Sequence, residues 1–190
     1  MKRLKSEVSG RFDPFSDRLA RDIRNTLSEA FVAALTRKQR SVYQKTAATW
    51  LNKNLAQPYV RYIHDRLQRY GHIFKQINDN QLNDVRLQTL LIWNKGLFFE
   101  VHDHLETIWA RTSGDEHQAL KGLIKASGVF IHMEHGHQDA VERLSLKSSK
   151  LLRQYSHCLT FITNLNVLIE TLAQQNPKPP RLENPAISAG

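Results

Sequence analysis

The chain has 190 residues, 41% of them hydrophobic, which is enough to bury the core of one domain with a sizeable extension. It contains no run of about 18 apolar residues and no secretory signal, so the sequence predicts a cytoplasmic protein without a membrane span. The single cysteine, Cys158, excludes an internal disulfide and a thiolate metal site, and we expect it to be a small buried hydrophobe.

The formal net charge of +9 resides in the first part of the chain. Residues 1–83 contain 16 Lys or Arg against 7 Asp or Glu, whereas residues 84–190 contain 11 of each. A basic region of this kind is typical of a solvated surface, or of a region that binds an acidic protein, a nucleic acid or an anionic membrane surface. The basic residues form no compact run of five or more, which weakens the nucleic-acid interpretation.

Helical periodicity runs through nearly the whole sequence, and no strand-like alternation of apolar and polar residues is evident. We therefore predict an all-α fold. Ser16 is the predicted N-cap of a first helix of about 20 residues. A second helix is predicted within residues 38–54, and a third begins near Pro58 and is interrupted or ended at Gly71.

The second half of the chain reads as a compact helical bundle. A short helix is broken near residues 94–96 and is followed by a helix over FFEVHDHLETIW, residues 98–109. The next helix is apolar almost all round, is predicted to be central in the bundle, and ends at residues 135–137. Two amphipathic helices follow, the second over HCLTFITNLNVLIETLAQQ, and the tail, with four of the six prolines, is predicted to be irregular or disordered.

The predicted organisation is a basic helical N-terminal region, a polar linker, a helical-bundle domain and a Pro-rich tail, at residues 1–77, 78–84, 85–175 and 176–190.

Polar residues lie among the large apolar side chains of FFEVHDHLETIW. On a helix with about 100° per residue, His102 and Glu106 are one turn apart, within or at the edge of the apolar face. The same projection predicts that Glu100, His104 and Thr107 point toward water. Because burying a lone charged group is costly, His102 and Glu106 are expected to meet partners from the next helix.

The next helix offers such partners on a stripe with Lys121, Lys125 and His132. In a functional interpretation, His102, Glu106 and His132 ligate a divalent metal ion, since imidazole and carboxylate groups at positions i and i+4 face the same side. In a structural interpretation, the glutamate pairs with a lysine and both histidines are hydrogen-bonded, which fixes the register of the helices. The spacing alone leaves both open.

The segments WNKGLFFEVHDHLETIW, ALKGLIKASGVFIHMEHGH and DAVERL, within about residues 84–155, resemble the bacterial and archaeal family called domain of unknown function 309. The resemblance implies a small helical bundle with a metal site at the His-x-x-x-Glu-x-x-Trp core, here His102, Glu106 and Trp109, but implies no activity. This chain has lysines, Lys121 and Lys125, where the family has glutamines. Two ammonium groups would repel a cation and would suit an anionic ligand, or ion pairs with Glu106 and Asp103.

Three hypotheses follow from these patterns. The first is a polar pocket that binds a metal or a small anionic ligand and acts as a hydrolase with Glu106 or His102 as general base. The second is an interaction module whose basic N-terminal helices bind an acidic protein or a nucleic acid, and the third is a subunit of a homo-oligomer. The residues of the predicted pocket are His102, Glu106, Trp109, Asp103, Glu100, Lys121, Lys125 and His132.

Two other patterns receive a simpler interpretation. His132, His135 and His137 resemble a metal motif, but Gly136 is expected to end the helix there, which favours a polar surface turn. The chain has no nucleophile elbow and no phosphate-binding glycine loop, so the sequence does not indicate a Ser-His-Asp hydrolase or a nucleotide enzyme.

Overall fold

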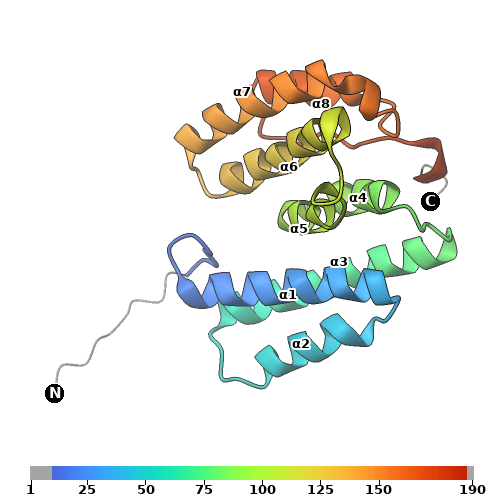
Figure 1. Cartoon of the computed structure of the whole chain (residues 1–190). Coiled ribbons are helices and arrows are strands. Elements are labelled where there is room, and N and C mark those ends of the chain that lie inside the picture. Colours follow the sequence, from blue (N-terminus) through green and yellow to red (C-terminus); the bar gives the residue numbers. More distant parts are fainter. Residues whose placement is uncertain (1–9, 188–190) are drawn as a thin grey trace. The chain divides into compact units, whose positions relative to one another are not determined.

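The computed structural model describes residues 10–187, and within this range it contains eight α-helices and no strand (Figure 1). The predicted all-α helical fold is therefore confirmed. The described part of the chain divides into two compact units, with the boundary between Tyr70 and Gly71. None of the helices in residues 10–187 combines the length and the apolar character that a membrane span requires. The linker and domain bounds proposed from the sequence stay predictions.

The first unit contains α1 (Arg18–Arg37), α2 (Ser41–Leu51) and the first part of α3 (Gln57–Asp79). The N-cap of α1 is Asp17, whose carboxylate accepts a hydrogen bond from the Leu19 N–H at 2.9 Å. The prediction of Ser16 as N-cap was wrong because the Ser16 hydroxyl donates to Asp13 Oδ2, at 2.6 Å. Asp17 also accepts a hydrogen bond from the Tyr59 hydroxyl, which ties the start of α1 to α3.

Aromatic side chains form much of the core of the first unit. Phe31 of α1 is fully buried, stacks on Tyr70 of α3 at 4.1 Å between ring centroids, and meets Tyr43 of α2 edge-on at 6.0 Å. Helix α3 does not end at Gly71 as predicted, but continues to Asp79. A glycine inside a helix costs only about 1 kcal/mol relative to alanine, which the buried residues on either side, Tyr70 and Ile73, offset.

The second unit contains five α-helices: α4 (Val85–Asn94), α5 (Phe98–Trp109), α6 (Gly114–Glu134), α7 (Gln138–Gln154) and α8 (Leu165–Ala173). Helix α6 packs against α5 and α7, so its predicted central position is confirmed (Figure 1). Gly122 allows α6 to approach α7 closely, because a Cβ atom there would lie 3.1 Å from Leu151 Cβ and from Leu152 Cδ2.

The last predicted helix is shorter than expected. A 3₁₀ turn at Ser156–Cys158 and irregular backbone precede α8, which begins only at Leu165, and Cys158 is half-buried instead of buried. The backbone before α8 is engaged elsewhere, since Thr163 N–H donates to Glu183 O at 2.9 Å. The side chain of Asn164 also donates to Arg181 O, at 2.8 Å. These contacts hold the backbone of residues 159–164 in turns, where the apolar pattern alone favours a helix.

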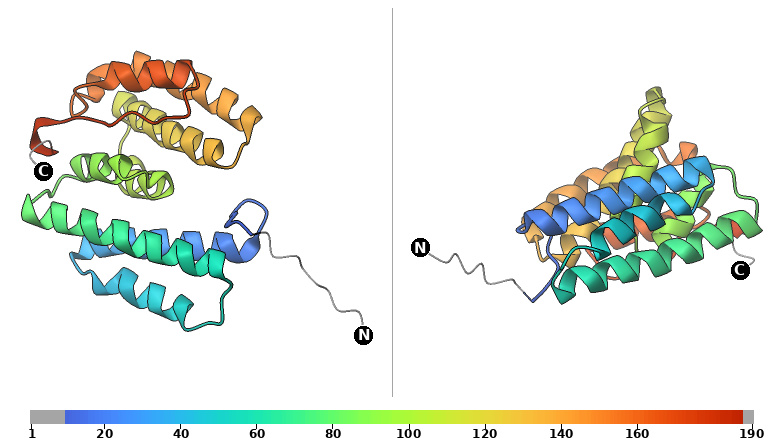
Figure 2. Two further views of the ribbon diagram at one scale, coloured as in Figure 1. Left: turned by 180° about the vertical axis from the view of Figure 1, so that it is seen from behind. Right: turned by 90° about the horizontal axis from the view of Figure 1, so that it is seen from below.

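The Pro-rich tail is irregular and is held in place by side-chain amides. Asn94, at the end of α4, donates to Leu182 O and accepts from Leu182 N–H, both at 2.8 Å. Trp93 Nε1–H donates to Pro180 O at 2.8 Å, and Leu182 is only 1% exposed. Figure 2 shows the tail running from α8 back to α4. Of the two expectations for residues 176–187, irregular or disordered, these contacts favour the first.

Replacing Asn94 by alanine is expected to release this tail. The change removes both hydrogen bonds to Leu182 and leaves buried backbone groups without them, which costs about 1 to 3 kcal/mol. Hydrogen exchange at residues 178–187 should then accelerate about 5- to 140-fold, since each 1.4 kcal/mol of local stability is a factor of 10. Asn166→Ala, an exposed position in α8, is the matched control. Unchanged protection in Asn94→Ala would show that Asn94 does not hold the tail.

Candidate functional site

Helix α5 is positioned by the turn before it and by its buried face. Gly96 has a φ of 67°, a left-handed conformation that glycine adopts without strain, and it separates α4 from α5. The predicted break at residues 94–96 is thus confirmed. Phe98, Val101 and Leu105 are the buried apolar residues of α5, and Glu100 and His104 are buried beside them. The other polar residues of the helix lie outside this buried face.

Three polar side chains gather on one flank of α5. His102 Nε2 lies 3.7 Å from Glu106 Oε1, and His102 Nδ1 lies 3.3 Å from Asp103 Oδ1. One potential ligand atom from each of the three residues lies within 4.8 Å of the other two. Their side chains are 36%, 49% and 20% exposed for His102, Glu106 and Asp103, so solvent reaches the group. We call these three residues the α5 group.

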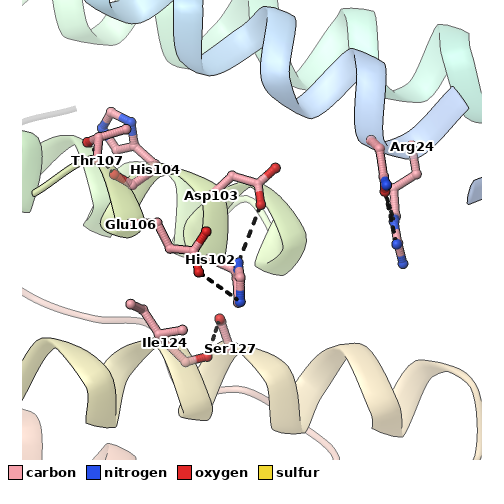
Figure 3. A network of polar contacts seen from close by, with 9 residues as sticks. Arg24, His102, Asp103, His104, Glu106, Thr107, Ile124 and Ser127 are labelled. Atoms are coloured by element: carbon pink, nitrogen blue, oxygen red, sulfur yellow. Dashed lines mark hydrogen bonds and ion pairs between the residues drawn. The ribbon is translucent and has the colours of Figure 1, made fainter. Parts of the chain in front are cut away.

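Two members of the α5 group, His102 and Glu106, lie toward helix α6. Figure 3 shows the His102 ring between the Asp103 and Glu106 carboxylates, with its outer edge toward Ser127 of α6. The Ser127 hydroxyl donates to the Ile124 carbonyl at 2.8 Å, within its own helix. Ser127 therefore places a hydroxyl group near the histidine ring but supplies no ionisable group.

The prediction for Glu100 and His104 was wrong, because both are buried, at 0% and 2% exposure. Figure 3 shows His104 on a different side of α5 from His102. Gln88 of α4 donates from Nε2 to Leu82 O at 2.8 Å, so its Oε1 accepts from His104 Nε2, at 3.1 Å. Burial lowers the pKa of His104 from 6.5 to about 4, which keeps its imidazole neutral at physiological pH.

The burial of His104 has a signal in the sequence. Leu97, Phe98, Val101 and Leu105 are spaced as the apolar stripe of an amphipathic helix, and this spacing includes position 104. A projection centred on Val101 instead of His102 places His104 at the edge of the buried face. Glu100 has no such signal, because it lies about 100° from Val101, as His102 does on the other side.

The lysines of the predicted pocket do not join the α5 group. Within residues 10–187, neither Lys121 nor Lys125 forms an ion pair with Glu106 or Asp103. The pKa of Lys125 is lowered by burial, and further by the positive charges of Lys121 and of Lys147 on α7. Lys125 thus lies close enough to Lys147 of α7 for the two positive charges to repel each other.

The remaining two residues of the predicted pocket have other partners. Trp109 ends α5, where its ring stacks on His117 at 4.5 Å between centroids and its Nε1–H donates to His117 O. It thereby fixes the connection between α5 and α6. His132, at the far end of α6, lies with Nδ1 3.1 Å from His137 Nδ1. The structure thus brings together His102, Glu106 and Asp103, and places His132 with His137.

These observations describe an all-α protein whose second unit is a helical bundle with a histidine and two carboxylates grouped on α5. Residues 87–144, from α4 to the middle of α7, match the family model described as "Domain of unknown function (DUF309)". This segment is therefore similar to that family, and the resemblance read from the sequence is confirmed. No curated protein and no solved structure matches the chain.

Proposed function

We propose that the chain binds a divalent metal ion through the α5 group, His102, Asp103 and Glu106. The observation that supports this function is the proximity of three ligand atoms within 4.8 Å. Metal–ligand bonds to histidine nitrogen and carboxylate oxygen are about 2.0–2.2 Å long, so two ligands of one ion lie at most about 4.4 Å apart. Small side-chain rotations therefore suffice to bring these atoms around one ion.

The two ring nitrogens of His102 have different roles in this proposal. Asp103 Oδ1 accepts from the protonated Nδ1, which leaves the Nε2 lone pair directed toward Glu106. A carboxylate that orients a ligating histidine in this way is a common feature of metal sites. Nε2 of His102 and a Glu106 oxygen are then the first two ligands, and Asp103 orients the imidazole or supplies a third oxygen.

The partial exposure of the α5 group bears on its chemistry. A site with two or three protein ligands leaves positions open to water, and a bound metal lowers the pKa of that water. Hydrolysis is therefore the enzymatic activity that we propose for this site. His102 and Glu106 are ligands in this proposal, so neither of them keeps the general-base role considered from the sequence. One nitrogen and two oxygens suit Mn²⁺, Fe²⁺ or Zn²⁺.

The lysines of α6 do not oppose this proposal. At about 100° per residue, Lys121 and Lys125 lie about 120° and 160° from Ser127 around the axis of α6. Since Ser127 is on the side of His102, the ammonium groups project to other sides of the helix. A small anionic ligand would accordingly bind at Lys121, Lys125 and Lys147 rather than at the α5 group, and this ligand stays a prediction.

Binding of Mn²⁺ to the metal-free full-length protein tests the proposed function. We expect about one equivalent of Mn²⁺ at the α5 group, measured as the loss of the free-ion signal in electron paramagnetic resonance. The variant His102→Ala/Glu106→Ala should lose this binding, because only Asp103 remains. The control His64→Ala/Glu170→Ala removes an exposed histidine and an exposed glutamate elsewhere and should keep it. Equal binding by wild type and by the α5 variant, or no binding by the wild type, would contradict the proposal.

The interaction-module and homo-oligomer hypotheses stay predictions. The first requires salt-dependent association through the basic N-terminal helices, and the second requires self-association that is independent of metal.

A further inference from the structure

The turn between α6 and α7 gathers three histidines, His132, His135 and His137. Helix α6 ends at Glu134, and Gly136 has a φ of 72°, which reverses the chain. The His137 N–H donates to His132 O at 3.1 Å, which closes the turn. As a result, the ring of His137 returns toward the ring of His132.

The two rings meet through equivalent atoms, since His132 Nδ1 and His137 Nδ1 are 3.1 Å apart. Two imidazole nitrogens at this distance either share a proton or direct their lone pairs at a common ion. With nitrogen–metal bonds of about 2.05 Å, a separation of 3.1 Å corresponds to an angle of about 100° at the metal, near the tetrahedral value. The distance therefore fits two ligands of one transition-metal ion.

The surroundings favour the neutral form of His132. Its pKa is lowered by burial, and further by His137 and by the positive charge of Arg143 on α7. Metal ions bind neutral imidazole, which is the form that a lowered pKa favours. The positive charge of Arg143 also disfavours any cation that is bound by electrostatic attraction alone. Binding here must therefore depend on coordination by nitrogen, which Zn²⁺, Ni²⁺ and Cu²⁺ accept and Mg²⁺ and Ca²⁺ do not.

We propose that the α6–α7 turn is a second metal site, in which His132 and His137 bind Zn²⁺ or a similar transition-metal ion through their Nδ1 atoms. His135 provides a third imidazole after rotation of its side chain, since its ring already stacks on His137 at 6.1 Å between centroids. The donor set consists of nitrogen alone and differs from that of the α5 group. This proposal does not depend on the proposed function.

The site can be tested in the background His102→Ala/Glu106→Ala, which removes the α5 group as a competing site. Zn²⁺ is titrated into the full-length protein and followed by calorimetry. We expect the background variant to bind about one equivalent, and the further change His132→Gln/His137→Gln to weaken binding at least about tenfold, because even groups outside the ligand shell contribute this much. The matched control is His64→Gln/His157→Gln, which also removes two histidines and should bind as the background does. Equal Zn²⁺ affinity with and without His132 and His137 would overturn the proposal.

Nitrogen NMR of the histidine rings in the wild-type chain provides a test that does not depend on how the variants fold. Zn²⁺ should shift the Nδ1 resonances of His132 and His137 from the values of a protonated and an acceptor nitrogen to those of metal-bound nitrogens. Unchanged Nδ1 resonances at saturating Zn²⁺ would show that the two rings only share a proton, and the proposed site would be wrong.

Discussion

Replacing Trp93 by alanine is expected to lower the free energy of unfolding of the second unit by about 4 kcal/mol, the range for emptying a large aromatic site in a core. Trp93 is 2% exposed and meets Phe98 of α5 and Phe130 of α6 edge-on, at 5.1 and 5.4 Å between ring centroids. Its Nε1–H also donates to Pro180 O. One side chain thus joins α4, α5, α6 and the tail.

Urea unfolding followed by far-ultraviolet circular dichroism measures this effect. Trp93→Phe separates the contributions, because it keeps an aromatic ring against Phe98 and Phe130 but removes the donor to Pro180. We expect it to cost clearly less than Trp93→Ala, about 1 to 2 kcal/mol for the lost hydrogen bond and volume. Trp109→Phe, at a half-buried position, is the control for a tryptophan at the end of α5. A loss below about 2 kcal/mol in Trp93→Ala would show that Trp93 is not a central core residue.

The second unit is expected to lose stability as the pH falls from about 6.5 to about 4, because of His104. Burial lowers the pKa of this imidazole from 6.5 to about 4, so the unfolded chain takes up the proton first as the pH falls. Its contribution is complete above pH 6.5, declines through this window and is absent below it. A shift of this size corresponds to about 3 kcal/mol, at about 1.4 kcal/mol per pH unit.

The variant His104→Gln tests this pH dependence. Glutamine does not titrate, and its amide can still donate to Gln88 Oε1. The difference in the free energy of unfolding between wild type and variant should therefore fall by about 3 kcal/mol between pH 7.5 and pH 4. Leu105→Val is the matched control on the same helix, since it destabilises the core without removing a titratable group. If His104→Gln and the wild type show parallel pH profiles, His104 is not the buried neutral group described here.

The sequence determined the class of fold and most of the helix ends. Helical periodicity is a local property, so it predicts all-α structure without knowledge of what packs against what. Gly96 and Gly136 were predicted to end helices for a local reason as well, and both have positive φ. The family resemblance was equally local, because it rests on spacing within α5 and α6.

Where local preferences compete, the tertiary structure decided which of them prevails. Asp17 and Ser16 are both good N-caps, and the hydrogen bond of Asp17 with Tyr59 favours the first. The apolar pattern before α8 favours a helix, but the tail occupies Asn164 and the backbone before it. Neither outcome can be predicted from the neighbouring residues alone, since both depend on interaction partners far along the chain.

In the candidate site, too, the local sequence predicted some features and packing between helices decided the others. The sequence identified His102 and Glu106 as neighbours, because residues four apart on a helix share a side. It could not say which flank of α5 would be buried, since polar residues border the apolar stripe on both sides. Packing of α4 placed Gln88 beside His104 and buried that flank, while His102 stayed within reach of solvent. His132 contacts His137 because the turn at Gly136 reverses the direction of the chain. Periodicity fixes which side chains share a helix face, whereas only packing between helices fixes what each face meets.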